Sequence, residues 1–376
     1  MENLGLYIHI PFCVHKCAYC DFYSLTSRYD AKDYAEALIT QIKSCKKIGK
    51  NYFVDTIYIG GGTPSCIDPE LIYKILDTVK SVFCVSPDAE ITIEANPGTL
   101  ESSGLSTYHS AGVNRLSIGL QSSDEMELKL LSRIHTWKDF ESTFILARLE
   151  GFDNINVDIM YALPAQTRER LAKTLSDVIA LSPDHISFYG LKIEENTLFG
   201  QSENIKKALP DEELQYKMYM ESAETLEKNG YMQYEISNFA KKGKECRHNL
   251  KYWHCKDYIG FGVAAASLFK GRLFSYVKNL DLFLLDPLSP ELVAESERLS
   301  QKDLANQYIM LSLRLTEGAN RMDYARDFGG DLDKEYAQKL QPFIDKKLAE
   351  RTPSGFRLTR RGMLVSNYIL SEIIDF

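Results

Sequence analysis

Three cysteines near the start of the chain are the residues best suited to chemistry. Cys13, Cys17 and Cys20 lie within eight residues, at spacings of four and three, directly after the strand-like run 7–12. Thiolates bind soft metals, chiefly zinc, copper(I) and iron–sulfur clusters. Three thiols at this spacing indicate one multidentate ligand for a metal or a cluster, rather than a two-thiol redox pair.

The number and order of these cysteines favour a cluster over zinc. A structural zinc site usually has four ligands in two pairs separated by a loop. Here no second pair lies nearby in the sequence, and His15 falls awkwardly between the first two cysteines. A [4Fe–4S] cluster normally takes four cysteines, so three would leave one iron open to a small molecule. Zinc and plain structural thiols remain as alternatives.

A glycine-rich turn at 60–64 follows an apolar strand and precedes a helix. Glycines let the backbone approach a ligand closely, with N–H groups facing it. The turn lacks the spacing of a P-loop and of a dinucleotide fingerprint. By itself it fits a tight structural turn as well as a ligand cradle.

Polar residues also stand at or near the ends of later strands: Glu94, Gln121, Arg133 and Asp158. A carboxylate just inside a strand end needs a partner to be tolerated. Glu94 and Asp158 could hold ribose hydroxyls, and Arg133 could hold a carboxylate. The alternative is a set of ordinary salt bridges on the rim of a barrel.

The elements that must position these residues alternate between strand and helix from residue 4 to about 195. The strands are predicted at 6–12, 54–59, 91–95, 115–120, 155–161 and 185–191. Their continuous apolar runs are typical of a parallel sheet covered on both faces, with right-handed crossovers. In such barrels function collects at the C-terminal ends of the strands. Six units favour an α/β fold with a partial (β/α)6 TIM-like barrel.

Three regions are predicted along the chain. The barrel takes residues 1–230, a connecting region takes 231–290, and a mainly helical, winged-helix-like domain takes 291–376. Within the connecting region a strand is expected at Met232–Ser237. Three isolated cysteines are expected to be small buried apolar residues: Cys45, Cys66 and Cys84.

The composition restricts the classes of partner. A net charge of −8 argues against a nucleic-acid binder held by phosphate contacts. No apolar run is long enough to span a bilayer, and no signal peptide is evident. We therefore expect a cytoplasmic protein, a monomer or a homodimer, with reduced cysteines and no stable membrane insertion.

The pattern Tyr7-x-His9-Ile10-Pro11-Phe12-Cys13-x3-Cys17-x-Tyr19-Cys20, with the Gly-Gly-Thr-Pro turn, resembles the radical S-adenosylmethionine (SAM) superfamily. More narrowly, it resembles the branch that holds oxygen-independent coproporphyrinogen III oxidase and the haem chaperones of the HemW family. The resemblance implies that the three cysteines hold a [4Fe–4S] cluster whose fourth iron is chelated by SAM. It also implies that the following residues line one or two SAM sites: Tyr7, Tyr19, Gly61, Gly62, Thr63, Glu94, Gln121, Arg133 and Asp158.

Two departures favour the chaperone branch over the oxidase. The oxidase has a further cysteine two residues after the third, where this chain has Phe22, and it carries an extra N-terminal segment. The segment 234–240, followed by His248-Asn249-x-x-Tyr252-Trp253, resembles the haem-chaperone signature.

This branch of the resemblance implies haem binding, with His248 as an axial ligand. Cys246 and Cys255 flank the motif and are alternative ligands. The resemblance further implies haem transfer to acceptor haemoproteins, which could be membrane-bound respiratory enzymes. It predicts no oxidase activity; the alternative is coproporphyrinogen oxidation or another radical SAM reaction.

Overall fold

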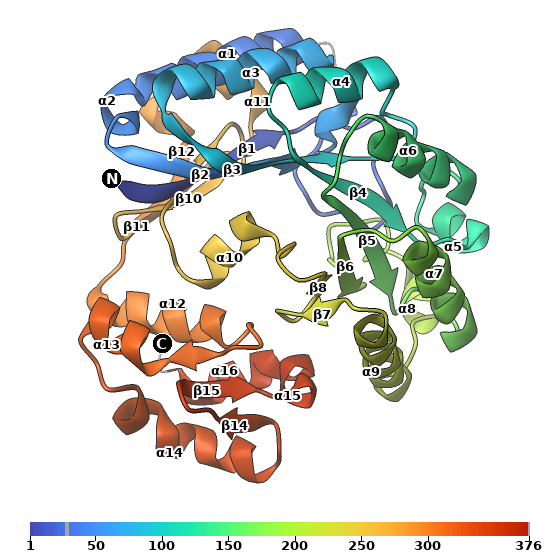
Figure 1. Cartoon of the computed structure of the whole chain (residues 1–376), viewed down its shortest axis with the longest axis vertical. Helices are drawn as coiled ribbons and strands as arrows, with labels where there is room; N and C mark the ends of the chain where they lie inside the picture. Colours follow the sequence, from blue (N-terminus) through green and yellow to red (C-terminus); the bar gives the residue numbers. More distant parts are fainter. Residues whose placement is uncertain (27–29, 375–376) are drawn as a thin grey trace.

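The first half of the chain folds into a curved parallel sheet whose outer side is covered by helices (Figure 1). The computed structural model describes residues 1–26 and 30–374. Neighbouring strands from β1 to β6 all pair in parallel. Their bounds are β1 Glu2–Ile10, β2 Tyr52–Gly61, β3 Cys84–Ala95, β4 Arg115–Gln121, β5 Ile155–Tyr161 and β6 His185–Gly190.

Helices follow the strands, as the alternation predicts. The helix α3 begins because Asp68 accepts a hydrogen bond from the N–H of Glu70 and Pro69 occupies its first turn. Its buried stripe includes Ile72, Ile75 and Val79. The helices of this half are α1 Ala31–Ser44, α2 Lys46–Gly49, α3 Pro69–Val82, α4 Ser102–Ser110, α5 Glu125–Leu130, α6 Trp137–Leu149, α7 Arg168–Ala180, α8 Glu203–Lys207 and α9 Glu212–Lys228.

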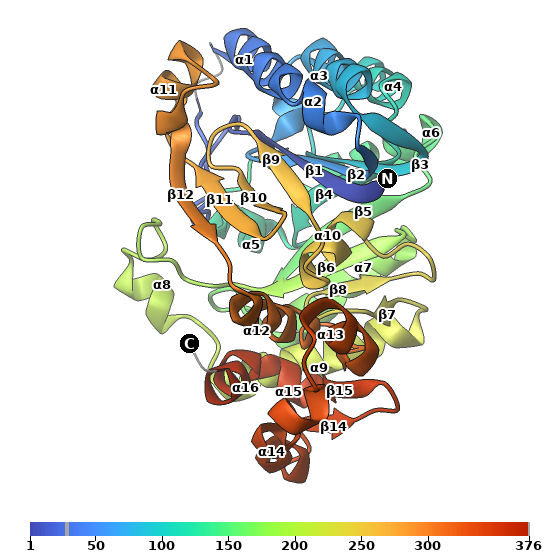
Figure 2. The ribbon, with the colours of Figure 1, turned by 90° about the vertical axis from the view of Figure 1, so that its left-hand side faces the viewer.

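The sheet continues beyond the predicted six strands at both edges. It runs in the order β12-β11-β10-β9-β1-β2-β3-β4-β5-β6-β8-β7, and only β9 among the later strands pairs in parallel, with β1. Figure 2 shows β9–β12 beside β1. These strands are β7 Met232–Gln233, β8 Asn238–Ala240, β9 Tyr258–Phe261, β10 Ala266–Phe269, β11 Arg272–Tyr276 and β12 Val293–Arg298. The connecting region thus extends the barrel sheet, while the domain boundaries stay a prediction.

Two local expectations are wrong. The predicted strand Met232–Ser237 is instead β7 and part of a turn leading to β8, because the carboxylate of Glu235 accepts the N–H of Ser237 at 2.8 Å and bends the chain. Cys84 is exposed because it is the first residue of β3. Cys45 and Cys66 are only half-buried.

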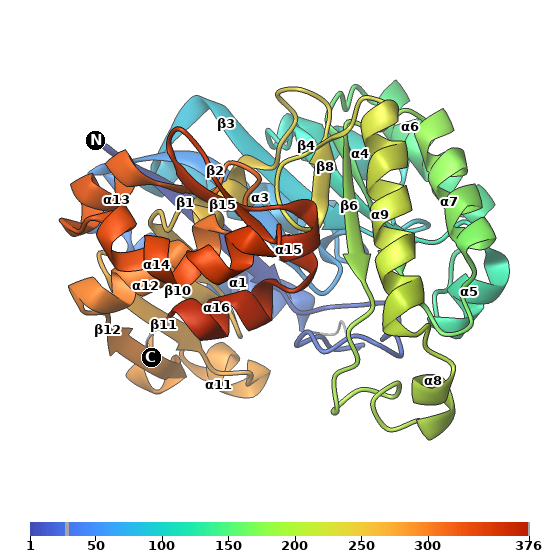
Figure 3. The same ribbon diagram turned by 90° about the horizontal axis from the view of Figure 1, so that it is seen from below.

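The C-terminal part packs a small antiparallel sheet against helices, with its own apolar core. Figure 3 shows this part beside the barrel, on the far side from α6 and α7. Its elements are α12 Gln301–Ser312, β13 Ala319–Asn320, α13 Arg321–Phe328, α14 Leu332–Asp345, β14 Ala349–Arg351, β15 Gly355–Leu358, α15 Arg360–Leu364 and α16 Ser366–Ile373. Helix α11 (Leu280–Leu285) lies outside this part.

The helix α10 (Arg247–Trp253) lies between the sheet and the C-terminal helices (Figure 1). In the described residues, no helix has the length and apolar character that crossing a membrane requires.

Candidate functional site

A cavity of about 1100 Å³ occupies the concave side of the sheet. It extends from the cysteine loop to α10 and to Gln307 and Leu311 of α12. Its wall brings together every residue predicted for the cluster or for SAM: Tyr7, Cys13, Cys17, Tyr19, Cys20, Gly61, Gly62, Thr63, Glu94, Gln121, Arg133 and Asp158. His248 alone among the predicted site residues does not line it.

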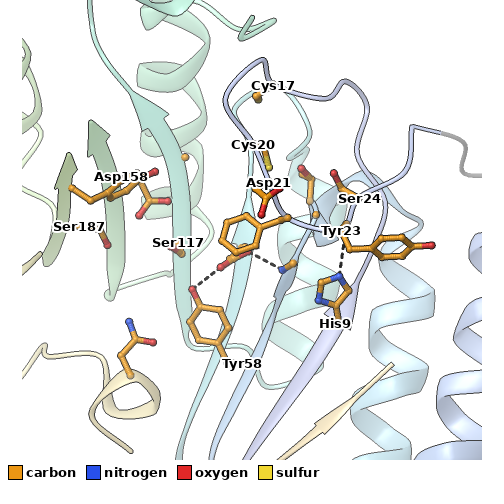
Figure 4. A pocket seen from close by; sticks show the side chains of 18 of the residues that line it. His9, Cys17, Cys20, Asp21, Tyr23, Ser24, Tyr58, Ser117, Asp158 and Ser187 are labelled. Atoms are coloured by element: carbon orange, nitrogen blue, oxygen red, sulfur yellow. Dashed lines mark hydrogen bonds between the residues drawn. The ribbon is translucent and has the colours of Figure 1, made fainter. Parts of the chain in front are cut away.

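The three cysteines lie on a loop that is closed at its base. The N–H of Cys13 donates to the carbonyl of Leu25 at 2.8 Å, and the N–H of Leu25 donates to the carbonyl of Pro11 at 2.6 Å. Figure 4 shows Cys17 and Cys20 on this loop, above Tyr58. Burial raises the pKa of the Cys13 and Cys20 thiols. A bound cation would therefore be needed to favour their thiolate forms.

A chain of hydrogen bonds joins the first two cysteines through residues from three other segments. Thr63 Oγ1 lies 3.5 Å from Cys13 Sγ and accepts the amide of Asn96 at 2.8 Å. Asn96 in turn accepts Nη2 of Arg133 at 2.6 Å, and Nη1 of Arg133 lies 3.4 Å from Cys17 Sγ. The guanidinium also donates to the carbonyl of Gly119. Arg133 thus holds a positive charge against the cysteine loop.

An apolar cluster supports the other side of the loop. Phe199, from the segment after β6, is buried, and its N–H donates to the carbonyl of Ala18 at 3.1 Å. The Tyr19 ring lies 6.3 Å from the Phe199 ring. The buried members are Ala18, Leu131, Met160, Leu163 and Phe199. Such packing fixes the loop and keeps water from its inner side.

The glycine turn is required by protein packing as well as by any ligand. Gly61 has φ +111°, and a Cβ there would come within 2.4 Å of the His9 ring. A Cβ on Gly62 would come within 2.6 Å of the carbonyl oxygen of Phe12. The tight-turn interpretation therefore accounts for the glycines, and both residues still line the cavity.

Two carboxyl groups face the cavity from β3 and β5. Glu94 accepts the Tyr58 hydroxyl at 2.8 Å and the N–H of Gly61 at 3.1 Å. Burial, with Asp158 nearby, raises the pKa of Glu94 to about 7 despite these hydrogen bonds. Burial also raises the pKa of Asp158, which accepts the Asn156 amide at 2.7 Å. Neither carboxyl is in a rim salt bridge among the described residues, so both remain available to a ligand.

Gln121 ends β4 with φ +76°, a left-handed backbone that a non-glycine residue adopts only at a cost. The register with β5 shifts at this point, and the side-chain oxygen accepts the Tyr189 hydroxyl at 2.7 Å. Gln121 lines the cavity, as Asp158 does.

His248 lies behind the cavity wall rather than on it. Its side chain is fully buried, with Nδ1 2.9 Å from Thr56 Oγ1 and Nε2 2.8 Å from the Tyr252 hydroxyl. Burial lowers its pKa to about 3, so the imidazole is neutral. In this conformation the predicted axial ligand has no free nitrogen, because β2 and α10 supply partners for both.

The rest of the His-Asn-x-x-Tyr-Trp segment does reach the cavity. Asn249, Tyr252 and Trp253 line it from α10. The carboxylate of Glu90 accepts the N–H groups of Arg247 and His248, each at 3.1 Å, and so fixes the start of this helix. Of the alternative haem ligands, Cys246 is fully buried and points to Glu90, while Cys255 packs on the C-terminal core.

Comparison with known proteins decides the family. Residues 7–178 match the radical SAM superfamily, and residues 299–365 match the HemN C-terminal domain. The heme chaperone HemW of Escherichia coli (strain K12) is 36% identical over 98% of each chain. That of Bacillus subtilis (strain 168) is 34% identical over 98% of each chain. This chain belongs to the HemW family of radical SAM proteins.

A solved structure confirms the predicted fold of this HemW-family chain. Coproporphyrinogen III oxidase (HemN) from Escherichia coli, a radical SAM enzyme, matches 99% of this chain and 90% of its own, with a TM-score of 0.87 and 24% identity. The α/β barrel with a C-terminal helical domain is therefore the shared architecture.

Sequence reasoning missed three residues that support the predicted site residues. Asn96 links Thr63 to Arg133, Tyr189 holds Gln121, and Phe199 supports the cysteine loop. Asn96 follows the end of β3, so the rule that function collects at strand ends could have found it. Phe199 gave no local signal, because its partners lie far away in the sequence.

Proposed function

We propose that this protein is a haem chaperone that binds haem, carries a [4Fe–4S] cluster with SAM, and passes haem to acceptor haemoproteins. Near full-length kinship with the HemW proteins supports this function. The structural observation that carries it is one shared cavity, which has the cysteine loop at one end and Asn249, Tyr252 and Trp253 of α10 at the other.

The residues at the cysteine end fit a cluster. Three thiols share a closed loop, with the Arg133 guanidinium beside Cys17 and apolar packing behind the loop. In the part of the chain that the structure describes, no group of three or more His, Cys, Asp and Glu side chains is arranged to hold a metal ion by itself. In our proposal Cys13, Cys17 and Cys20 each ligate the cluster, which supplies one-electron chemistry and an open iron for SAM.

The polar wall fits SAM. The same space is lined by Gly61, Gly62, Thr63, Tyr7 and Tyr19. Glu94 and Asp158 offer carboxyl oxygens to hydroxyl groups, and Gln121 offers an amide. Arg133 supplies the positive charge that an amino-acid carboxylate needs.

At the α10 end of the cavity, we still propose His248 as a ligand of the haem iron. Metal-ligating histidines usually donate their second ring N–H to a protein acceptor, and Thr56 Oγ1 is placed to accept Nδ1–H at 2.9 Å. Nε2, the nitrogen that would bind iron, is then hydrogen-bonded to the Tyr252 hydroxyl. We propose that haem displaces this hydroxyl, so that ligation by His248 requires the Tyr252 side chain to move.

We further propose that the protein acts in the cytoplasm as a monomer or a homodimer, and divides into regions 1–230, 231–290 and 291–376. Its acceptors could include membrane-bound respiratory enzymes. We also propose that nucleic acid is not a partner, since a net charge of −8 argues against binding through phosphate contacts.

The test is a haem titration of the anaerobically reconstituted protein, with and without its cluster, followed by transfer to an apo-haemoprotein. We expect a haem absorption band separate from that of the cluster, and its loss when the acceptor is added. Cys17→Ser should remove the cluster and leave haem binding in place. Conversion of coproporphyrinogen III by the pure protein, given SAM and a reductant, would instead favour the oxidase function.

A further inference from the structure

A buried arginine lines the cavity at the opposite end of β4 from the cysteine loop. Arg115 is the first residue of β4, whereas Gln121 at the cluster end is its last. The six residue steps from Arg115 to Gln121 correspond to about 20 Å between their backbone positions, at about 3.3 Å per step. Arg115 lines the cavity and its residue is only 2% exposed.

The guanidinium of Arg115 has no acceptor among the described residues. Its Nε atom is buried without a hydrogen bond. Three carboxyl groups lie close enough to interact electrostatically with Arg115, and each already has other donors. Glu94 accepts the Tyr58 hydroxyl and the N–H of Gly61. Glu90 accepts the N–H groups of Arg247 and His248, and Asp158 accepts the Asn156 amide.

A second unpartnered group lies beside it. Thr92 of β3 is directly opposite Arg115 in the sheet register, is fully buried, and has a hydroxyl without a hydrogen bond. An arginine remains charged in proteins, and burying an unpaired charge is strongly unfavourable. A partner supplied by a ligand would remove this penalty, and the planar guanidinium fork matches a carboxylate.

We propose that Arg115, which lines the cavity, binds a carboxylate of the molecule there, and that this carboxylate is a propionate of haem. Thr92 lies behind Arg115, outside the lining of the cavity, and leaves it without a protein acceptor. This inference rests on the proposed haem-binding function. The other carboxylate ligand of that function is SAM, whose amino-acid end belongs at the cysteine loop, at the other end of β4. Arg115 instead shares its part of the cavity with Tyr58, Asn156 and Ser117 and lies near α10.

The test compares haem with its dimethyl ester, in which both propionates are blocked, on the reconstituted full-length protein. The wild type should bind haem roughly 10- to 100-fold more tightly than the ester, as expected for one charged pair. Arg115→Gln should bind haem and its ester with equal affinity. Its affinity should fall for haem and stay unchanged for the ester. Arg115→Lys, which keeps the charge but not the fork, should retain part of the preference.

The exposed Arg298 of β12 provides the matched control, and Arg298→Gln should keep the full preference. SAM affinity should not change in Arg115→Gln. The inference is overturned if Arg115→Gln still prefers haem to its ester, if both ligands weaken equally, or if SAM affinity falls instead. A wild type that binds neither haem nor the ester would overturn the haem-chaperone function itself, and this inference with it.

Discussion

The guanidinium of Arg133 lies 3.4 Å from the sulfur of Cys17, across 116 residues of chain. The same side chain bonds Asn96, which bonds Thr63, whose hydroxyl lies beside Cys13. The loop that carries the cysteines is therefore tied to the ends of β2, β3 and β4. The cluster site depends on the barrel, and not on the cysteine spacing alone.

Arg133→Gln should weaken the hold of the protein on its cluster. The variant removes the positive charge beside Cys17 and the donor to Asn96, so we expect roughly 10-fold weaker retention, as for other groups that orient metal ligands. Iron content after reconstitution, and iron loss to a chelator, measure this. Arg168→Gln, which removes a surface arginine paired with Glu221, is the control. Equal retention in the two variants would contradict the role of Arg133.

Phe199→Ala should speed the release of iron from the cysteine loop. The effect should exceed what the general loss of folding stability in this variant would cause. Truncating a buried phenylalanine costs about 3–5 kcal/mol. Phe152→Ala removes an equally buried ring that lies just before β5, away from the loop. At conditions where both variants are equally folded, we expect faster iron release from Phe199→Ala alone. If both release iron at the same rate, the apolar cluster has no specific part in holding the loop.

The sequence predicts the barrel and most of its site because the signals are local. Apolar runs mark β2, β4 and β5, and the ends of parallel strands meet at one edge, which brings Glu94 and Asp158 together with the cysteine loop. The strands β7–β12 have two to six residues each. Such short segments carry no clear periodic pattern.

Long-range hydrogen bonds explain the other differences. The position of His248 depends on Thr56, 192 residues earlier, and no spacing rule connects them. The sequence therefore indicates a histidine suited to binding iron. It cannot show that both ring nitrogens already have hydrogen-bond partners.

Tyr252→Phe should raise haem affinity if His248 is the axial ligand. The hydroxyl of Tyr252 must leave Nε2 before iron can bind, and one hydrogen bond contributes about 1 kcal/mol, or roughly 5-fold in affinity. Tyr231→Phe is the control, since it also removes one buried tyrosine hydroxyl, which donates to the carbonyl of Pro183 at 3.0 Å, and Tyr231 does not line the cavity. His248→Ala should abolish the spectrum of the ligated iron. Weaker haem binding by Tyr252→Phe would show that Tyr252 contacts haem directly.

Glu94→Gln should change how stability depends on pH in the protein without cluster or SAM. The pKa of Glu94 rises from 4.5 to about 7 on folding. Between these values the unfolded chain releases a proton that the folded chain keeps, so stability falls as pH rises, by about 3 kcal/mol in all. Below pH 4.5 the group contributes no such loss, and above pH 7 the loss is constant.

Glutamine cannot titrate, so the stability of Glu94→Gln relative to the wild type should increase steadily from pH 4.5 to 7. Denaturant unfolding at several pH values measures this slope. The loss of the hydrogen bond from Gly61 shifts the variant by a constant amount at every pH, and therefore leaves the slope unaffected. The exposed Glu101 gives the matched control, because Glu101→Gln should follow the wild type. A wild type and a Glu94→Gln variant with parallel pH profiles would mean that Glu94 is already ionised in the folded protein, and that burial does not govern this carboxyl.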